Sequence, residues 1–162
     1  ACSRAAGGGR VAKRCAAVAC VEADLPDRAD RKRRLLAAKG VLSATHRVVP
    51  VNSRAEDGPD SVAALLEGLD PARPVAVITE GLINYFSLES ITPFWGRLAT
   101  SLQRFPSGVY LSDNYPLYAN MRFHRTLKNL GGLLGAVSRS QVAFHFSSDA
   151  DTERHFLNQG FD

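Results

Sequence analysis

Short apolar runs alternate along the chain with longer stretches in which apolar residues recur every three or four positions. The short runs are rich in β-branched residues and end at polar ones, which is typical of buried strands, whereas the longer stretches have the period of amphipathic helices. This pattern predicts strands at residues 18–23, 47–51, 75–79, 108–112 and 142–146. It predicts helices at residues 26–39, 61–69, 88–104, around 121–130, and 149–159.

Local signals agree with these boundaries. Pro26 suits the first turn of a helix, because its fixed φ is helical and its missing N–H would have no partner there. Gly40 follows Lys39 and marks the end of that helix. Five strands separated by helices imply a mainly parallel sheet with helices on both faces. The predicted fold class is therefore α/β.

Polar residues of acceptor type come directly after four of the predicted strands. They are Asp24, Asn52, Glu80 and Asp113. In open α/β sheets, ligands bind at the carboxyl ends of the strands, so we expect these residues along one binding edge.

The chemistry of these positions suits an adenosyl ligand. A carboxylate at Asp24 can accept two hydrogen bonds from the vicinal hydroxyls of a ribose, and its charge strengthens them. Asn52 could bond an adenine edge, and Glu80 could meet the cationic amino-acid end of a cofactor. Glu22 has the same side-chain parity as Asp24 but lies inside the strand. These assignments fit either NAD or S-adenosyl-methionine, although no complete G-x-G-x-x-G follows a strand, which disfavours an NAD oxidoreductase.

Three segments together resemble the leucine carboxyl methyltransferase family, which includes bacterial O-methyltransferases linked to polyketide biosynthesis. They are VEADLPDRADRKRRLL at 21–36, HRVVPVNSR at 46–54 and VITEGLINYF at 77–86, in the family's order and approximate spacing. The resemblance implies a Rossmann-like class I methyltransferase sandwich with a mainly parallel sheet, and S-adenosyl-L-methionine as the cofactor.

The resemblance also implies roles for individual residues. Asp24 takes the ribose-binding position of the E-x-D-[LF]-P motif, and Asn52 and Ser53 stand where the family usually has an Asp-Leu pair beside the adenine. Glu80 opens the E-G-L-L-x-Y motif near the methionyl part of the cofactor, and Tyr85 takes its aromatic position.

The beginning of the chain departs from the family pattern. Ala1 and Ser3 fall in the cofactor-binding first strand and its turn, with Ser3 where a glycine is expected. We expect one partial domain over residues 1–162 that lacks most of the first and last strands, with residues 115–139 as an insertion covering the substrate. Two functions follow as alternatives: an active enzyme, or a truncated, catalytically inactive remnant or binding module of the same fold.

The expected reaction is O-methylation of a carboxylate or a hydroxyl on a small molecule. A carboxylate needs no base, whereas a hydroxyl would, and His124 is the best candidate for that base. We expect His145 to be a structural strand residue and His46 and His155 to lie on the surface.

Composition narrows the remaining options. With 45% hydrophobic and 22% charged residues, the 162-residue chain has the content of a globular protein. Its net charge of +4 comes without a nucleic-acid-binding motif, so we expect no nucleic-acid partner, and the basic run at 28–34 is expected to be a solvated helix face. Cys2, Cys15 and Cys20 lack the spacing of a disulfide framework or zinc site, which favours the cytoplasm, and no run reaches the ~20 apolar residues of a membrane span.

Overall fold

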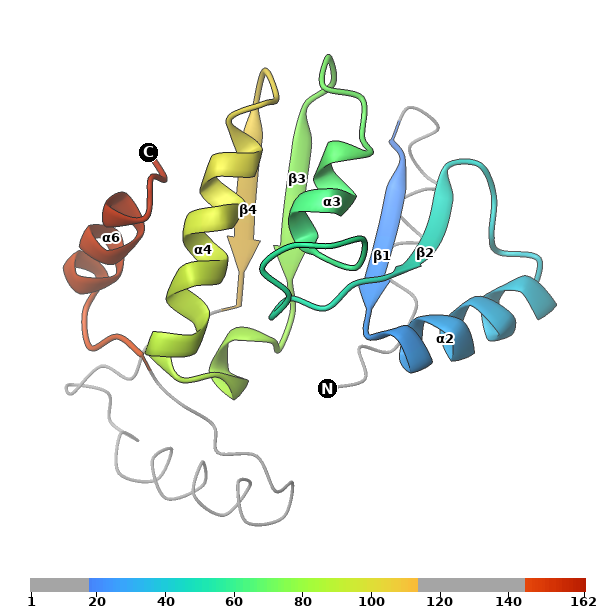
Figure 1. Cartoon of the computed structure of the whole chain (residues 1–162), viewed down its shortest axis with the longest axis horizontal. Helices are drawn as coiled ribbons and strands as arrows, with labels where there is room; N and C mark the ends of the chain where they lie inside the picture. The colour runs from blue at the N-terminus through green and yellow to red at the C-terminus, as the bar shows by residue number, and fades with distance from the viewer. Residues whose placement is uncertain (1–17, 114–144) are drawn as a thin grey trace, which may run out of the picture. The chain divides into compact units, whose positions relative to one another are not determined.

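The structure is a computed structural model that describes residues 18–113 and 145–162, as two compact units (Figure 1). We call residues 18–68 the N-terminal unit, and residues 69–113 with 145–162 the C-terminal unit. Several predictions fall outside the described residues: Ala1, Ser3, Cys2, Cys15, His124, the helix around 121–130 and the insertion at 115–139.

The N-terminal unit contains two parallel strands and two helices. They are β1 (Cys20–Asp24), α2 (Pro26–Ala38), β2 (His46–Pro50) and α3 (Val62–Glu67). The register of the parallel pair places Cys20 opposite His46 and Asp24 opposite Pro50. Helix α2 begins at a proline and packs on the strands through a small core of Ala29, Leu36 and Val48.

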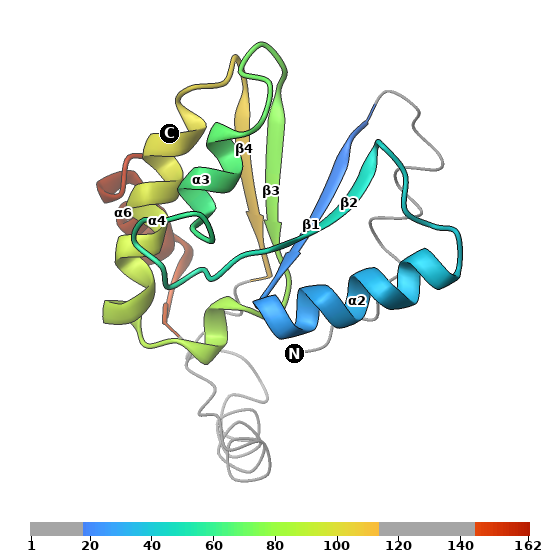
Figure 2. The same ribbon diagram turned by 45° about the vertical axis from the view of Figure 1, so that its right-hand side comes forward.

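The C-terminal unit repeats this parallel pairing. Its elements are β3 (Val75–Thr79), the 3-10 turn η1 (Ile83–Tyr85), α4 (Leu88–Leu102), β4 (Gly108–Ser112) and α6 (Asp149–Asn158). Strand β3 pairs in parallel with β4, with Thr79 opposite Ser112. Helices α4 and α6 lie on the same side of this pair (Figure 2). The other side exposes apolar residues, among them Ile78 and Leu111.

An aromatic cluster around Trp95 joins the helices to the strands of the C-terminal unit. Trp95 is fully buried; its ring is stacked with that of Phe146 at a centroid distance of 6.2 Å and tilted against that of Phe156 at 4.8 Å. Its indole N–H donates to the Tyr110 hydroxyl of β4 at 3.3 Å, and that hydroxyl lies 2.9 Å from the Thr79 hydroxyl of β3. The cluster therefore fixes α4, α6 and the strand pair to one another.

Most of the predicted elements are confirmed. Strands 75–79 and 108–112 have the predicted bounds, and the other predicted elements that fall wholly within the described residues are present with ends shifted by a few residues. The α/β fold class with parallel strands is confirmed as well. None of the helices within residues 18–113 and 145–162 has the length and apolar content needed to cross a bilayer.

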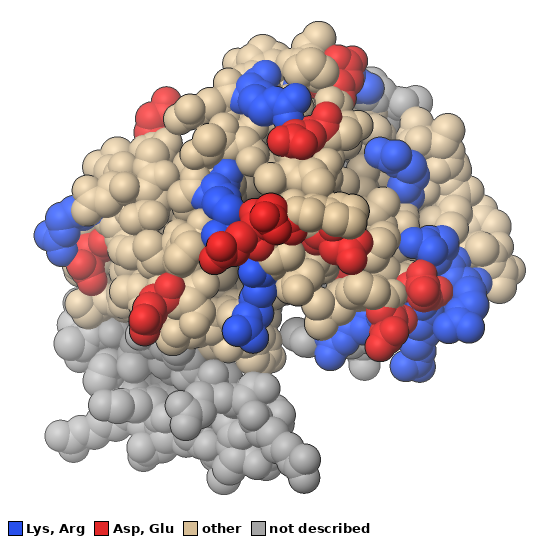
Figure 3. All heavy atoms as spheres, in the orientation of Figure 1, with Lys and Arg blue, Asp and Glu red and all other residues tan. Residues whose placement is uncertain are grey.

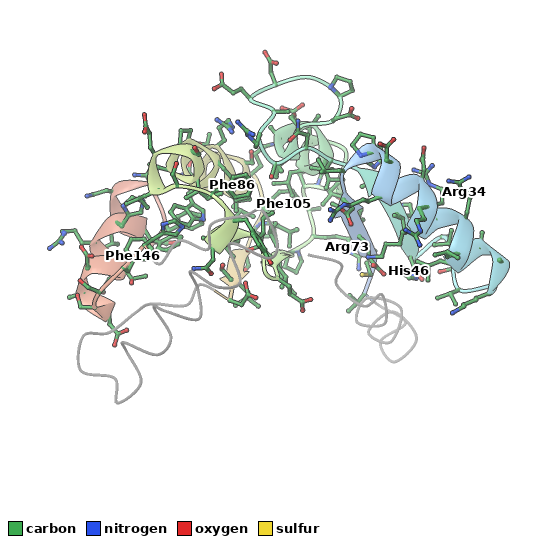
Figure 4. All side chains as sticks on the ribbon, turned by 90° about the horizontal axis from the view of Figure 1, so that it is seen from below. Arg34, His46, Arg73, Phe86, Phe105 and Phe146 are labelled. Carbon is green, nitrogen blue, oxygen red and sulfur yellow. The ribbon has the colours of Figure 1, made fainter. Side chains whose placement is uncertain are left out.

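Four expectations are wrong. His145 and Phe146 are not in a strand; Phe146 instead lies buried beside α6, and residues 142–144 fall outside the described part (Figure 4). His46 is buried rather than on the surface, and His155 is half-buried with its ring 5.3 Å from that of Trp95. Lys32 departs from the otherwise solvated basic run, because its side chain is mostly buried.

We expect Trp95→Ala to lower the free energy of unfolding by about 3–5 kcal/mol, because a fully buried aromatic side chain is lost and a cavity remains. Leu157→Ala is the matched control, since Leu157 is an exposed residue of α6, and its effect should stay within about 0.5 kcal/mol. Urea unfolding of both variants measures this difference. Equal stability of the two variants would contradict the packing described.

Candidate functional site

Asp24 ends β1 and begins the connection to α2. Its Oδ1 atom accepts a hydrogen bond from the backbone N–H of Leu25 at 2.9 Å, which fixes the direction of the side chain. The backbone carbonyl of Asp24 accepts from the N–H of Val51 at 2.8 Å, so the parallel ladder continues to the very end of the strand. The side chain is half-buried, and no hydrogen bond is seen at Oδ2 within the described residues. As far as the described residues go, that oxygen can accept from a ligand.

Asn52 follows β2 at the same edge of the N-terminal unit. Its Oδ1 atom accepts from the backbone N–H of Arg54 at 3.0 Å, and its own N–H donates to the Asp60 carbonyl at 2.8 Å. These bonds fold the loop back on itself and orient the amide group. The carbonyl oxygen keeps a second lone pair for an amino group of a ligand. Ser53 is half-buried beside it.

A buried cluster of charged and ionisable groups lies beneath this edge. The Glu22 carboxylate binds the Lys32 ammonium of α2 through Oε2, and its Oε1 lies 2.6 Å from His46 Nε2 of β2. The other ring nitrogen of His46 lies 3.3 Å from the Val41 carbonyl. Figure 4 labels His46 at the strand side of α2, whereas Arg34 extends from the helix into solvent.

The cluster shifts two pKa values. Burial disfavours the charge on Glu22, but the hydrogen bonds from Lys32 and His46 outweigh it, and the pKa of Glu22 falls below its usual value. Burial and the neighbouring Glu22 charge raise the pKa of the Cys20 thiol, so it stays protonated at neutral pH. A thiol in that state is a poor nucleophile, which argues against a catalytic role for Cys20.

Two carboxylates follow the strands of the C-terminal unit. Glu80 comes directly after β3 and is exposed. Asp113 comes directly after β4, and its Oδ2 atom accepts from the N–H of Gly81 at 2.6 Å. Gly81 has φ +59°, a left-handed conformation that glycine adopts without steric cost. The turn after β3 is thereby fastened to the end of β4.

Asp113 has a second oxygen whose hydrogen-bonding capacity is not used. Oδ1 is buried and has no hydrogen-bond partner among residues 18–113 and 145–162. Buried carboxylate oxygens are nearly always paired in native proteins, because leaving one unpaired costs roughly 1–3 kcal/mol. A donor from a ligand at this edge would satisfy it.

Tyr85 lies on η1, a short element that the hydrophobic pattern does not predict. Its side chain is 43% exposed, while the two residues before it, Ile83 and Asn84, are buried. The Ile83 carbonyl lies 3.1 Å from His145 Nε2, so the imidazole ring of His145 contacts η1 rather than a strand. The phenol of Tyr85 is therefore exposed, five residues after Glu80 in the sequence.

Each strand pair thus brings two of the predicted polar residues to one edge: Asp24 with Asn52, and Glu80 with Asp113. Basic side chains gather over α2, with acidic ones among them (Figure 3). The acidic residues of this helix are Asp27 and Asp30. Within the described ranges, no three His, Cys, Asp or Glu side chains are grouped as metal ligands. The chemistry offered is that of hydrogen-bond acceptors for hydroxyl, amino and ammonium groups.

Sequence reasoning missed the role of Glu22. Its signal was present, because an acidic residue inside an otherwise apolar strand needs a partner when it is buried. The partners lie 10 and 24 positions along the chain, as the contacts to Lys32 and His46 show. Only the strand register and the helix orientation identify them.

Comparison with known proteins supports the resemblance seen in the motifs. A family model described as leucine carboxyl methyltransferase matches residues 11–95, just over half of the chain. The matched range includes Asp24, Asn52, Ser53, Glu80 and Tyr85. No curated protein matches the chain.

We expect Glu22→Gln to lower the free energy of unfolding at pH 7 by about 1–3 kcal/mol, because the variant leaves the buried Lys32 and His46 poorly paired. A lowered pKa in the folded state stabilises the protein above the usual carboxyl pKa of about 4.3. The advantage of the wild type should therefore shrink as the pH falls below that value. Denaturant titrations between about pH 3 and about pH 7 measure the difference in stability between the wild type and the variant. Glu56→Gln is the control, because Glu56 is an exposed loop residue. A difference that stays constant with pH would contradict the assignment.

Proposed function

The chain belongs to the leucine carboxyl methyltransferase family, a family of methyltransferases, and from this premise we propose that it is an S-adenosyl-L-methionine-dependent O-methyltransferase acting on a carboxylate or hydroxyl of a small molecule. The observation that carries the proposal is the edge formed by Asp24 and Asn52 at the end of β1 and beyond β2. Parallel pairing puts both residues at the carboxyl ends of neighbouring strands, and ligands of α/β sheets bind at such ends, which supports the proposal.

The residues present fit the cofactor. Asp24 has one oxygen that accepts from Leu25 and one without a partner in the described part of the chain, which suits the diol of a ribose. Asn52 is held in a folded loop and offers an amide to an adenine edge. Taken by itself, the C-terminal unit offers acceptors of its own for a cationic group, at Glu80 and at Asp113 Oδ1, which has no partner among the described residues. When bound, S-adenosyl-methionine would supply an electrophilic methyl group.

The protein's contribution to such a reaction is mainly positional. Methyl transfer is an in-line displacement, so holding the acceptor oxygen in line with the methyl group and excluding water supply most of the rate. A carboxylate acceptor is ionised at neutral pH and needs no base. For a hydroxyl acceptor we propose His124 as the base, with the outward-facing Tyr85 contacting the substrate.

The rival function is a catalytically inactive binding module of the same fold. It would use the same edge to hold the adenosyl group but would transfer no methyl group. Methyl transfer measured with radiolabelled cofactor, compared with cofactor binding by the same protein, separates the two functions.

We expect Asp24→Ala to weaken S-adenosyl-methionine binding to the full-length protein by at least about tenfold, because hydrogen bonds to a charged acceptor contribute about 1.5–3 kcal/mol. Isothermal titration calorimetry measures the dissociation constant. Asp27→Ala is the matched control, because this exposed acidic residue lies three positions further along, in the first turn of α2, and its loss should change binding less than about twofold. Wild-type protein that does not bind the cofactor would refute the proposed function.

His124→Ala provides a test of the acceptor. If the acceptor is a hydroxyl, the variant should lose about 100-fold or more in kcat, because a positioned base typically contributes that much. With a carboxylate acceptor the rate should be unchanged. Initial rates with the two acceptor classes measure this, and loss of activity toward both classes would contradict a role as base.

A further inference from the structure

The cluster of Glu22, Lys32 and His46 lies between β1, α2 and β2, the three elements that lead to the cofactor edge of the N-terminal unit. The side chains are 13%, 15% and 2% exposed, so the three groups are largely withdrawn from water. Replacing such a buried ionic cluster by apolar residues is often neutral or stabilising, so overall stability alone does not account for its presence. The cluster also determines how β1, α2 and β2 are arranged, because its contacts join β1 to both of the other elements.

Glu22 has a direct geometric relation to Asp24. The two residues are separated by one position in β1, so their side chains leave the strand on the same face. Helix α2 begins two residues after Asp24, and Lys32 lies about 9 Å further along the helix axis. The helix is therefore attached to β1 at two points, by the chain at its start and by the ion pair at its middle. Two points of attachment fix the direction in which the chain leaves Asp24.

Glu22 also sets the register of β1 against β2. His46 lies opposite Cys20, and its ring reaches across to Glu22, two positions further along β1. A slip of one residue would turn the face of one strand over and separate these groups. The same register places Asp24 opposite Pro50 and brings Asn52 to the shared edge. Arg33 of α2 adds a bond to the Val48 carbonyl of β2 at 3.3 Å.

From these contacts we propose that Glu22 is a positioning residue for the adenosyl ligand, holding the Asp24 carboxylate in the place and direction that the ribose hydroxyls require. This inference rests on the proposed function. Glu22 contacts no ligand itself, and it acts through Asp24.

The test is a double-mutant cycle on the full-length protein, with S-adenosyl-homocysteine as the probe. Glu22→Gln should raise the dissociation constant at least about fivefold in the wild-type background and less than about twofold in the Asp24→Ala background, because a residue that acts through Asp24 has nothing left to position. A residue that only supports the fold would weaken binding by the same factor in both backgrounds. That result would overturn the proposal.

A second cycle changes the ligand instead of the protein. The 2′-deoxy form of S-adenosyl-homocysteine lacks a hydroxyl that Asp24 would bind, so Glu22→Gln should affect its affinity less than that of the parent ligand. An equal loss of affinity for both ligands would contradict positioning of the ribose contact.

Lys32→Met keeps the test decisive if Glu22→Gln does not fold. This variant retains most of the buried side-chain volume and removes one attachment of Glu22, so a loss of binding of about threefold or more is expected, again only when Asp24 is present. Arg31→Met, at the neighbouring exposed position of α2, is the control and should bind like wild type. Equal affinity of Lys32→Met and Arg31→Met would overturn the proposal.

The outcomes also separate this inference from the proposed function. If wild type binds the probe and Asp24→Ala weakens it while neither Glu22→Gln nor Lys32→Met does, the proposed function stands and the positioning role falls. If Glu22→Gln weakens binding and Asp24→Ala does not, the positioning role falls as well. If wild type fails to bind, both are overturned.

Discussion

Parallel pairing of neighbouring strands is the constraint on which the candidate site depends. Strands that run in the same direction end at the same edge, so residues far apart in the chain meet there without any contact of their own. β1 with β2 brings Asp24 and Asn52 to the carboxyl end of their pair, and β3 with β4 brings Glu80 and Asp113 to the carboxyl end of theirs. Antiparallel pairing of the same segments would place these residues at opposite ends of each pair.

Backbone N–H groups in short turns hold the acceptor side chains at the ends of these strands. Leu25 donates to Asp24, Arg54 to Asn52, and Gly81 to Asp113. Each bond orients an acceptor before any ligand arrives, which reduces the entropy lost on binding. The acceptor capacity left over, at Asp24 and at Asp113 Oδ1, is what a ligand with hydroxyl and amino groups would use. The match of residues 11–95 to a methyltransferase family agrees with that chemistry.

The sequence predicted much of the fold because the signals are local. Pro26 at the start of α2 and the β-branched run in β3 determine their elements with little help from the rest of the chain. The prediction of a strand at 142–146 was wrong for His145 and Phe146, the two residues of it that the structure describes. Phe146 is apolar because its side chain is buried, not because its backbone pairs in a sheet. An alternating apolar segment can bury its side chains against a helix and an indole as well as against a sheet.

The candidate site was predictable only in part. The residues at the strand ends followed from periodicity, but their partners depend on the three-dimensional arrangement. Nothing local distinguishes a buried His46 bound to Glu22 from a surface histidine, and the role of Glu22 depends on strand register. His155 was misjudged for the same reason, because the opposing Trp95 comes from another helix.

The central claim is that the Asp24 carboxylate binds the ribose of an adenosyl ligand. A crystal structure of the full-length protein with S-adenosyl-homocysteine tests it most directly. We expect the ribose hydroxyls to lie within hydrogen-bonding distance, about 2.5–3.0 Å, of the Asp24 carboxylate, with the adenine beside Asn52. A ligand bound elsewhere, with Asp24 facing only solvent, would contradict it.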